Sequence, residues 1–252
     1  MTMVKPGKMI NTAKYVHNFN KTNQDPKITA YMQTKLKFKQ FGNVISITEV
    51  AEDAVGKVTI PSAINGVKVT GINKSAFLGC NDIHTLVFPN SITHIDFGAL
   101  SKCAGLKFVT LPDNLQTLGE FAFSDCPELV SIIIPKTLKA VPMRAFTQCY
   151  KLARVTIGES VIVIEQSAFA SCKGLTSIVI PDSVKTIMAG AFQNCTALIN
   201  VTLGEGVTSI GENAFAGCVK LGNVNLPANG GKTIKIHPTA FPVKTRINGV
   251  VK

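Results

Sequence analysis

The stretch AFASCKGLTSIVIPDSVKTI, residues 168–187, recurs in close variants along this chain of 252 residues. Its cysteine belongs to a series spaced by 23 residues, which begins with Cys80 and Cys103 and ends with Cys218. All seven cysteines of the chain stand in this series, and phenylalanine precedes each by three positions except at Leu100. A fixed period of this length is the signature of a repeat architecture, in which every unit has the same structure.

The residues after each cysteine predict a short strand. Apolar residues stand six and eight positions after the cysteine and a breaker follows directly, as in Ile178, Ile180 and Pro181. Apolar residues two apart that end at Pro or Gly are typical of a half-buried strand with a sharp stop. A second, weaker pattern then follows with apolar residues three apart, as in Val184 and Ile187.

A unit of this size cannot bury its apolar face alone, so each unit must stack on its neighbours. We therefore predict a solenoid of about eight coils, with parallel strands about 4.8 Å apart. Phe and Cys recur because every coil places them at the same height, where stacked rings fill the wide part of the core and a small thiol fills a tight corner. One thiol per coil neither converges on a metal ion nor suits a disulfide, so all seven cysteines are expected to be buried and reduced.

The unit resembles the BspA-like leucine-rich repeat, a cysteine-containing type with 23-residue coils. The resemblance covers roughly residues 41–241 and rests on AFASCKGLTSIVIPDSVKTI (168–187), AFAGCVKLGNVNLP (214–227) and a lengthened first coil, VTIPSAINGVKVTGINKSAF (58–77). It implies a leucine-rich-repeat solenoid. Members of the family are commonly surface-exposed adhesion or interaction proteins.

The two ends of the chain depart from the repeat, as the caps of a solenoid do. FGNVISITEV (41–50) is typical of strand material that opens a core, and ANGGKTIKIHPTAF (228–241) lengthens the last coil by three residues. We expect a basic N-terminal arm over residues 1–40 and a solenoid over residues 41–252. The solenoid would include an N-cap over 41–75 and a C-cap over 227–252.

Positive charge is concentrated in the arm. The chain has a formal net charge of +11, and residues 1–40 carry eight lysines against one acid, Asp25, which gives +7. Aromatic residues alternate with these lysines, and the predicted anchors are Lys14, Tyr15, Phe19, Tyr31, Lys35, Lys37, Phe38 and Lys39. Such a segment suits a tether to another chain, or nucleic acid held through phosphates and base stacking, or an acidic membrane surface. The alternation in KLKFKQF (35–41) fits a capping strand equally well.

Two sets of outward residues are candidate surfaces for a protein partner. The first, the sheet face, lies on the strands after the cysteines and comprises Val87, Phe108, Ile133 and Arg154. The second, the bend patch, lies near the bend before Ala-Phe and comprises Phe97, Phe121, Met143, Ile162 and Val163. Strand propensity alone explains outward β-branched residues, whereas an outward aromatic such as Phe108 indicates a contact.

No set of residues indicates a catalytic centre, a metal site or a cofactor. The histidines lack a matching Cys or carboxylate column, and the glycines of GEGVTSIGENAF (204–215) lack the lysine of a phosphate loop. No apolar run approaches the ~18 residues of a membrane helix, and the N-terminus has no apolar core of a secretory signal.

We therefore expect a non-enzymatic protein-interaction or structural scaffold that docks into a larger assembly by its basic arm. It would work in the cytoplasm or in a particle assembled inside the cell. One alternative is a cell-surface adhesin or receptor-binding module. A weaker alternative is a nucleic-acid-associated protein that acts through the arm.

Overall fold

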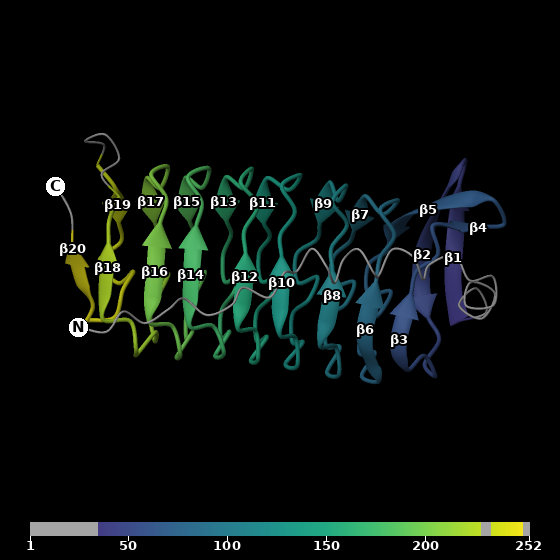
Figure 1. Ribbon diagram of the computed structural model, residues 1–252, viewed down its shortest axis with the longest axis horizontal. Helices are drawn as coiled ribbons and strands as arrows, with labels where there is room; N and C mark the ends of the chain where they lie inside the picture. The colour runs from purple at the N-terminus through teal and green to yellow at the C-terminus, as the bar shows by residue number, and fades with distance from the viewer. Residues whose placement is uncertain (1–34, 228–232, 249–252) are drawn as a thin grey trace, which may run out of the picture.

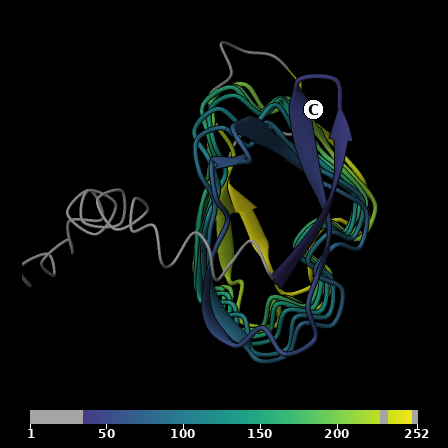
Figure 2. The ribbon, with the colours of Figure 1, turned by 90° about the vertical axis from the view of Figure 1, so that its right-hand side faces the viewer.

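The computed structural model describes residues 35–227 and 233–248. This part of the chain is a solenoid of short strands and tight turns, whose coils stack along one axis (Figure 1). Seen down that axis, the coils superimpose as an oval ring (Figure 2). The predicted leucine-rich-repeat solenoid is confirmed.

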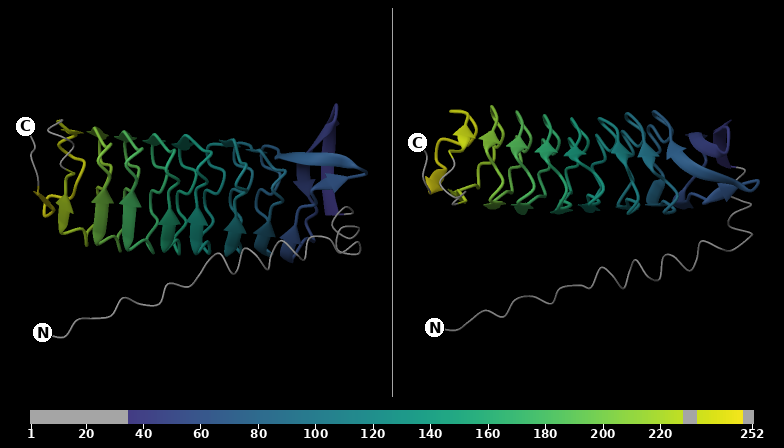
Figure 3. Two further views of the ribbon diagram at one scale, coloured as in Figure 1. Left: turned by 45° about the horizontal axis from the view of Figure 1, so that its top comes forward. Right: turned by 90° about the horizontal axis from the view of Figure 1, so that it is seen from above.

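Two rows of strands run along opposite sides of the ring (Figures 2 and 3). The first row arises from the apolar pairs that end at Pro or Gly. Within the described residues it holds nine strands, one for each coil, so the solenoid has about one coil more than the eight predicted. These strands are β3 (Gly56–Thr59), β6 (Ile83–Val87), β8 (Phe108–Thr110), β10 (Ser131–Ile133), β12 (Arg154–Thr156), β14 (Ser177–Ile180), β16 (Asn200–Leu203), β18 (Asn223–Asn225) and β20 (Arg246–Asn248). Hydrogen bonds join them into three consecutive sheets, β3-β6-β8, β10-β12 and β14-β16-β18-β20.

The second row arises from the weaker apolar pattern, and most of its strands are only two residues long. They are β5 (Val67–Ile72), β7 (His94–Ile95), β9 (Thr117–Leu118), β11 (Ala140–Val141), β13 (Val163–Ile164), β15 (Thr186–Ile187), β17 (Ser209–Ile210) and β19 (Lys235–Ile236). The short strand β4 (Ala63–Ile64) pairs with β5 in the lengthened first coil. Parallel pairing in both rows follows the repeat, with Ile132 opposite Val155 and Ile187 opposite Ile210. Equivalent side chains of successive coils therefore form straight columns.

The phenylalanine column fills the centre of the solenoid. Neighbouring rings lie with their centroids 5.0–5.4 Å apart and their planes within 11° of parallel, from Phe123 through Phe146, Phe169, Phe192 and Phe215 to Phe241. Leu100, which is also buried, interrupts the column between Phe77 and Phe123. Because apolar packing is tight and each ring from Phe146 to Phe215 contacts two others, the column links the stability of these coils to that of their neighbours.

The cysteine column ties each coil to the one before it. The Sγ atoms of the six cysteines from Cys103 to Cys218 donate to main-chain carbonyl oxygens of the preceding coil at 3.0–3.3 Å. In five cases the acceptor is the carbonyl of the preceding core phenylalanine, and for Cys126 it is that of Leu100. The thiol thus fills the corner, and its own buried S–H group finds an acceptor. Four of the six carbonyls, those of Phe77, Phe146, Phe169 and Phe192, also accept a hydrogen bond from a main-chain amide of their own coil.

An antiparallel hairpin covers the first coil. Strand β1 (Leu36–Phe41) pairs with β2 (Val44–Val50), and β2 pairs in parallel with β5 of the second row. Leu36 is buried in the core, and the carbonyl of Lys35 accepts a hydrogen bond from the amide of Ala51. Residues 36–40, which the sequence analysis placed in the arm, therefore form the outer strand of the cap.

Candidate partner-binding surfaces

The sheet face carries exposed apolar side chains on neighbouring strands of the first row. Phe108 on β8 is 53% exposed and Ile133 on β10 is 50% exposed. Val87 on β6 is half-buried, and Arg154 on β12 is exposed. The registers place Thr85 opposite Phe108 and Ser131 opposite Arg154. Phe108, Ser131 and Arg154 follow one another at the 23-residue period, so they occupy equivalent positions of successive coils. Val87 and Ile133 belong to the other outward column, opposite Thr110 and Thr156.

The bend patch is organised around two aromatic rings. The ring centroids of Phe97 and Phe121 lie 5.2 Å apart with the planes tilted by 46°. The Nζ of Lys74 lies 5.2 Å from the Phe97 centroid, and the Cζ of Arg144 lies 5.5 Å from that of Phe121. Cations over ring faces at such distances attract the rings, by about 0.5–1 kcal/mol at exposed sites.

Met143 joins the bend patch through its main chain. Its carbonyl accepts from the amide of Phe121 at 3.0 Å, and its own amide donates to a carboxylate oxygen of Glu165 at 2.9 Å. Val163 lies in β13 and Ile162 directly precedes that strand. These two residues therefore lie on the second row.

Phe121 has a backbone conformation that bulky residues rarely adopt. Its φ is +57°, and the equivalent position of every coil from Ser75 to Asn213 also has a positive φ. In three other coils that position holds Gly98, Gly190 or Asn213, which tolerate the left-handed region, and in three it holds Ser75, Arg144 or Ser167. A bulky aromatic there is an outlier that costs about 1–2 kcal/mol, and such strain concentrates at functional sites. The sequence shows that a phenylalanine at position 121 departs from the repeat, but it does not give the backbone dihedral angle.

The predicted arm anchors fall into two groups. Lys14, Tyr15, Phe19 and Tyr31 lie outside the residues that the structure describes. Lys37, Phe38 and Lys39 lie in β1, and Lys35 directly precedes it. The Nζ of Lys37 pairs with Glu49 of β2 at 2.7 Å, and that of Lys35 pairs with Asp53, just after β2, so two of the four form ion pairs within the cap itself.

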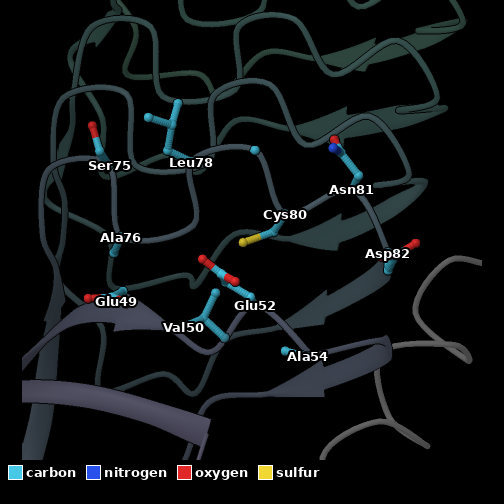
Figure 4. Close-up of a pocket in the computed structure, with 11 residues that line it drawn as sticks. Glu49, Val50, Glu52, Ala54, Ser75, Ala76, Leu78, Cys80, Asn81 and Asp82 are labelled. Carbon is cyan, nitrogen blue, oxygen red and sulfur yellow. The ribbon is translucent and has the colours of Figure 1, made fainter.

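A small pocket lies where the hairpin meets the first coil (Figure 4). Its lining includes the carboxylates of Glu49, Glu52 and Asp82 and the thiol of Cys80. A hydrogen bond with Cys103, together with burial, raises the pKa of the Cys80 thiol, so it stays neutral and is a poor nucleophile. Among the described residues, no group of three or more His, Cys, Asp or Glu side chains is placed to hold a metal ion.

The expectation that all seven cysteines are buried is wrong for Cys80. All seven are free, and six are buried, but Cys80 is half-exposed because the hairpin, not a further coil, covers it. Burial raises the pKa of Cys149, in the middle of the column, to about 12.

We expect a thiol reagent to modify one cysteine of the native protein slowly and all seven after denaturation without reductant. The neutral state of Cys80 slows its reaction, and burial protects the other six. Counting modified groups by mass spectrometry measures both numbers. Cys80→Ser should abolish the native reaction; rapid modification of several groups in that variant would contradict the buried column.

No helix in the described part of the chain is both long enough and apolar enough to cross a membrane.

Comparison with known proteins identifies relatives of this solenoid. The family model described as "BspA type Leucine rich repeat region" matches residues 70–198 and 162–250, in 6 copies. The leucine-rich repeat protein TpLRR of T. pallidum is 29% identical with a TM-score of 0.69, over 75% of this chain and 88% of that one. No curated protein matches the chain.

Two further solved structures share the fold at lower identity. A leucine-rich repeat protein from Eubacterium ventriosum is 23% identical with a TM-score of 0.62, over 73% of this chain and 50% of that one. The pneumococcal vaccine antigen PcpA is 19% identical with a TM-score of 0.58, over 87% of this chain and 64% of that one. At these identities the likeness concerns the fold alone.

Proposed function

Because the chain belongs to the BspA-type leucine-rich repeat family, we propose that it is a non-enzymatic protein-interaction scaffold. It presents the sheet face to a partner and docks into a larger assembly by its basic N-terminal segment. Leucine-rich repeats of this family are typical of protein-interaction and surface-adhesin proteins. Fold alone does not specify a function, so the proposal depends on the surface of this particular chain.

The observation that carries the proposal is Phe108. Phe108 is 53% exposed on β8, and Ile133, on the following strand β10 of the same row, is 50% exposed. Most outward positions on later strands are polar, such as Asn200, Thr202 and Asn223. Large aromatic side chains are enriched at the energetic centres of protein interfaces, and exposed apolar clusters mark contact sites.

The bend patch supports a second contact surface on the same molecule. Phe121 keeps a strained backbone although glycine occupies the same position in two other coils, at Gly98 and Gly190. Strain of this kind persists where the side chain serves a purpose. Phe97 is 45% exposed and its ring lies tilted against that of Phe121, which makes the pair suitable as an anchor.

Docking by the N-terminal segment is supported by its charge. Residues 1–34 carry five lysines and one acid, and they precede a hairpin that holds the chain firmly from Lys35 onward. Lysines bring such a segment to an acidic surface, and its aromatic residues can then be buried as anchors.

Deletion of residues 1–34 should leave the melting temperature nearly unchanged, because β1 and its pairing with β2 remain. The same deletion should abolish incorporation into the native assembly, measured by co-purification. As a control, Lys136→Ala in the full chain removes an exposed positive charge from the solenoid and should assemble normally. Normal assembly of the truncated protein would contradict docking by the arm. Recovery of the native protein by labelling of intact cells would instead favour the adhesin alternative.

A further inference from the structure

Asparagine is concentrated on the outward side of three paired strands, β16, β18 and β20, at one end of the first row (Figure 1). In the register, Asn223 lies opposite Arg246. Asn225 lies between Thr202 and Asn248. We call the six outward residues of these strands the amide face, and all six are exposed: Asn200, Thr202, Asn223, Asn225, Arg246 and Asn248.

Strand propensity does not explain these asparagines. Asn is depleted in strands, whereas β-branched and aromatic residues are enriched there. No outward position of the first-row strands from β3 to β14 holds Asn; residues such as Thr110, Ile133 and Thr156 stand there instead. Residues that break a local rule are expected at functional sites, so four asparagines on three neighbouring strands indicate a role beyond the fold.

The polar groups of the amide face are available to a ligand. The Nδ2 of Asn248 donates to the Oδ1 of Asn225 at 3.1 Å, which orients this pair of amides. In the described part of the chain, the side chains of Asn200, Asn223 and Arg246 make no hydrogen bond. Each asparagine side chain has two N–H donors and one acceptor oxygen, so the face can both donate and accept.

This end of the solenoid is also basic. Residues 213–252 contain six Lys and Arg residues and no Asp or Glu. Arg246 belongs to the face, and Lys220 and Lys244 are exposed shortly before β18 and β20. None of these three forms an ion pair within the described residues. The acid that comes nearest to the face along the chain is Glu205, in the turn after β16, so an anionic ligand complements the surface.

The composition of the face favours a polysaccharide among anionic ligands. Five of its six side chains are neutral hydrogen-bonding groups, which suits a ligand with more hydroxyl groups than charges. The face has no aromatic side chain, on which bases of a single strand would stack and which centres of protein interfaces favour. The exposed apolar residues just before β16 and shortly before β20, Ile199 and Val243, are aliphatic. Three cations are fewer than the roughly six to ten phosphate contacts of a protein that binds duplex DNA strongly.

We infer that the amide face binds a uronic-acid polysaccharide, which lies along the solenoid axis across β16, β18 and β20. The planar guanidinium of Arg246 binds a carboxylate, and the asparagine amides bind hydroxyl groups of neighbouring sugars. Lys220 and Lys244 attract further carboxylates. The site goes beyond the proposed function, because β10, β12 and β14 separate it from Phe108 on β8.

Fluorescence polarisation of a labelled hyaluronan oligosaccharide with the full-length chain tests this inference. The same oligosaccharide with its carboxylates reduced to alcohols should bind at least about tenfold more weakly, because it lacks the charge that Arg246 binds. Polyglutamate with an equal number of carboxylates should also bind at least about tenfold more weakly, because it lacks the hydroxyl groups.

The double variant Asn223→Val/Asn225→Val should weaken hyaluronan binding by about tenfold or more, because it removes two amides from the face. Valine suits an exposed strand position, so the melting temperature should not fall. Arg246→Gln should also weaken binding by about tenfold or more. Lys136→Ala, a control that removes an exposed positive charge elsewhere on the solenoid, should leave binding unchanged.

Failure of hyaluronan to bind would overturn the inference. Equal binding of polyglutamate would overturn it too, because charge alone would then explain the attraction. Tighter binding of a DNA duplex of the same charge would assign the face to nucleic acid instead. Unchanged binding by the double valine variant or by Arg246→Gln would place the ligand elsewhere. None of these results depends on Phe108, so the proposed function is tested separately.

Discussion

Phe169→Ala is expected to lower the free energy of unfolding by about 3–5 kcal/mol, because it leaves a cavity in the centre of the solenoid. The ring is fully buried and stacks on Phe146 at 5.4 Å and on Phe192 at 5.3 Å. The substitution thus removes contacts to both neighbouring coils at once. Main-chain hydrogen bonds between successive coils hold the backbone in place, so the cavity cannot close easily. Denaturant unfolding followed by circular dichroism measures the change.

The same substitution at Phe121, on the surface, is a matched control for Phe169→Ala in the core. Phe121→Ala should cost under about 1 kcal/mol, because the ring is only partly buried and contacts other surface groups. Phe121→Gly should be at least as stable as Phe121→Ala, because glycine adopts the positive φ of +57° without strain. Equal losses for Phe169→Ala and Phe121→Ala would show that the assignment of core and surface positions is wrong.

The repeat made the core of this protein predictable. A constant interval places equivalent residues in columns, so the burial of Phe146 and Leu152 could be inferred from their positions alone. The same register assigned Phe108 and Ile133 to the outside of the first row, where the structure has them. The ends of the first-row strands followed from the breakers, because Pro cannot donate a hydrogen bond to a sheet and Gly weakens a strand.

The ends of the solenoid could not be predicted in the same way. The alternation in residues 35–41 fits a free arm or a strand, and only the pairing of β1 with β2 decides between them. Cys80 occupies the same repeat position as Cys149, yet it is half-exposed because no regular coil precedes it. Burial at an end depends on non-local contacts, which the period does not encode.

The geometry of the surface also required coordinates. The sequence placed Phe97 and Phe121 on neighbouring coils, but at different positions of the repeat. Phe97 stands two residues before the repeat alanine of its coil, whereas Phe121 stands one residue before that of the next coil. Only the structure shows that the rings meet at 5.2 Å and that Lys74 and Arg144 lie over them.

Phe108→Asp is expected to weaken binding of the native partner by about 30-fold or more. Aromatic residues at the centre of an interface typically contribute at least about 2 kcal/mol, and about 1.4 kcal/mol corresponds to each factor of ten. The new carboxylate would also lose its hydration when an interface forms over it, which weakens binding further. The fold should tolerate the change, because the side chain points into solvent.

Site-specific photo-cross-linking in the native source tests the binding role of the sheet face most directly. A photo-reactive amino acid would replace Thr110, which is exposed on the same strand as Phe108, or Gln116, which is exposed beside the second row. The account predicts a discrete protein adduct from position 110, its loss in the Phe108→Asp background, and none from position 116. An adduct that forms equally from both positions, or that survives Phe108→Asp, would contradict it.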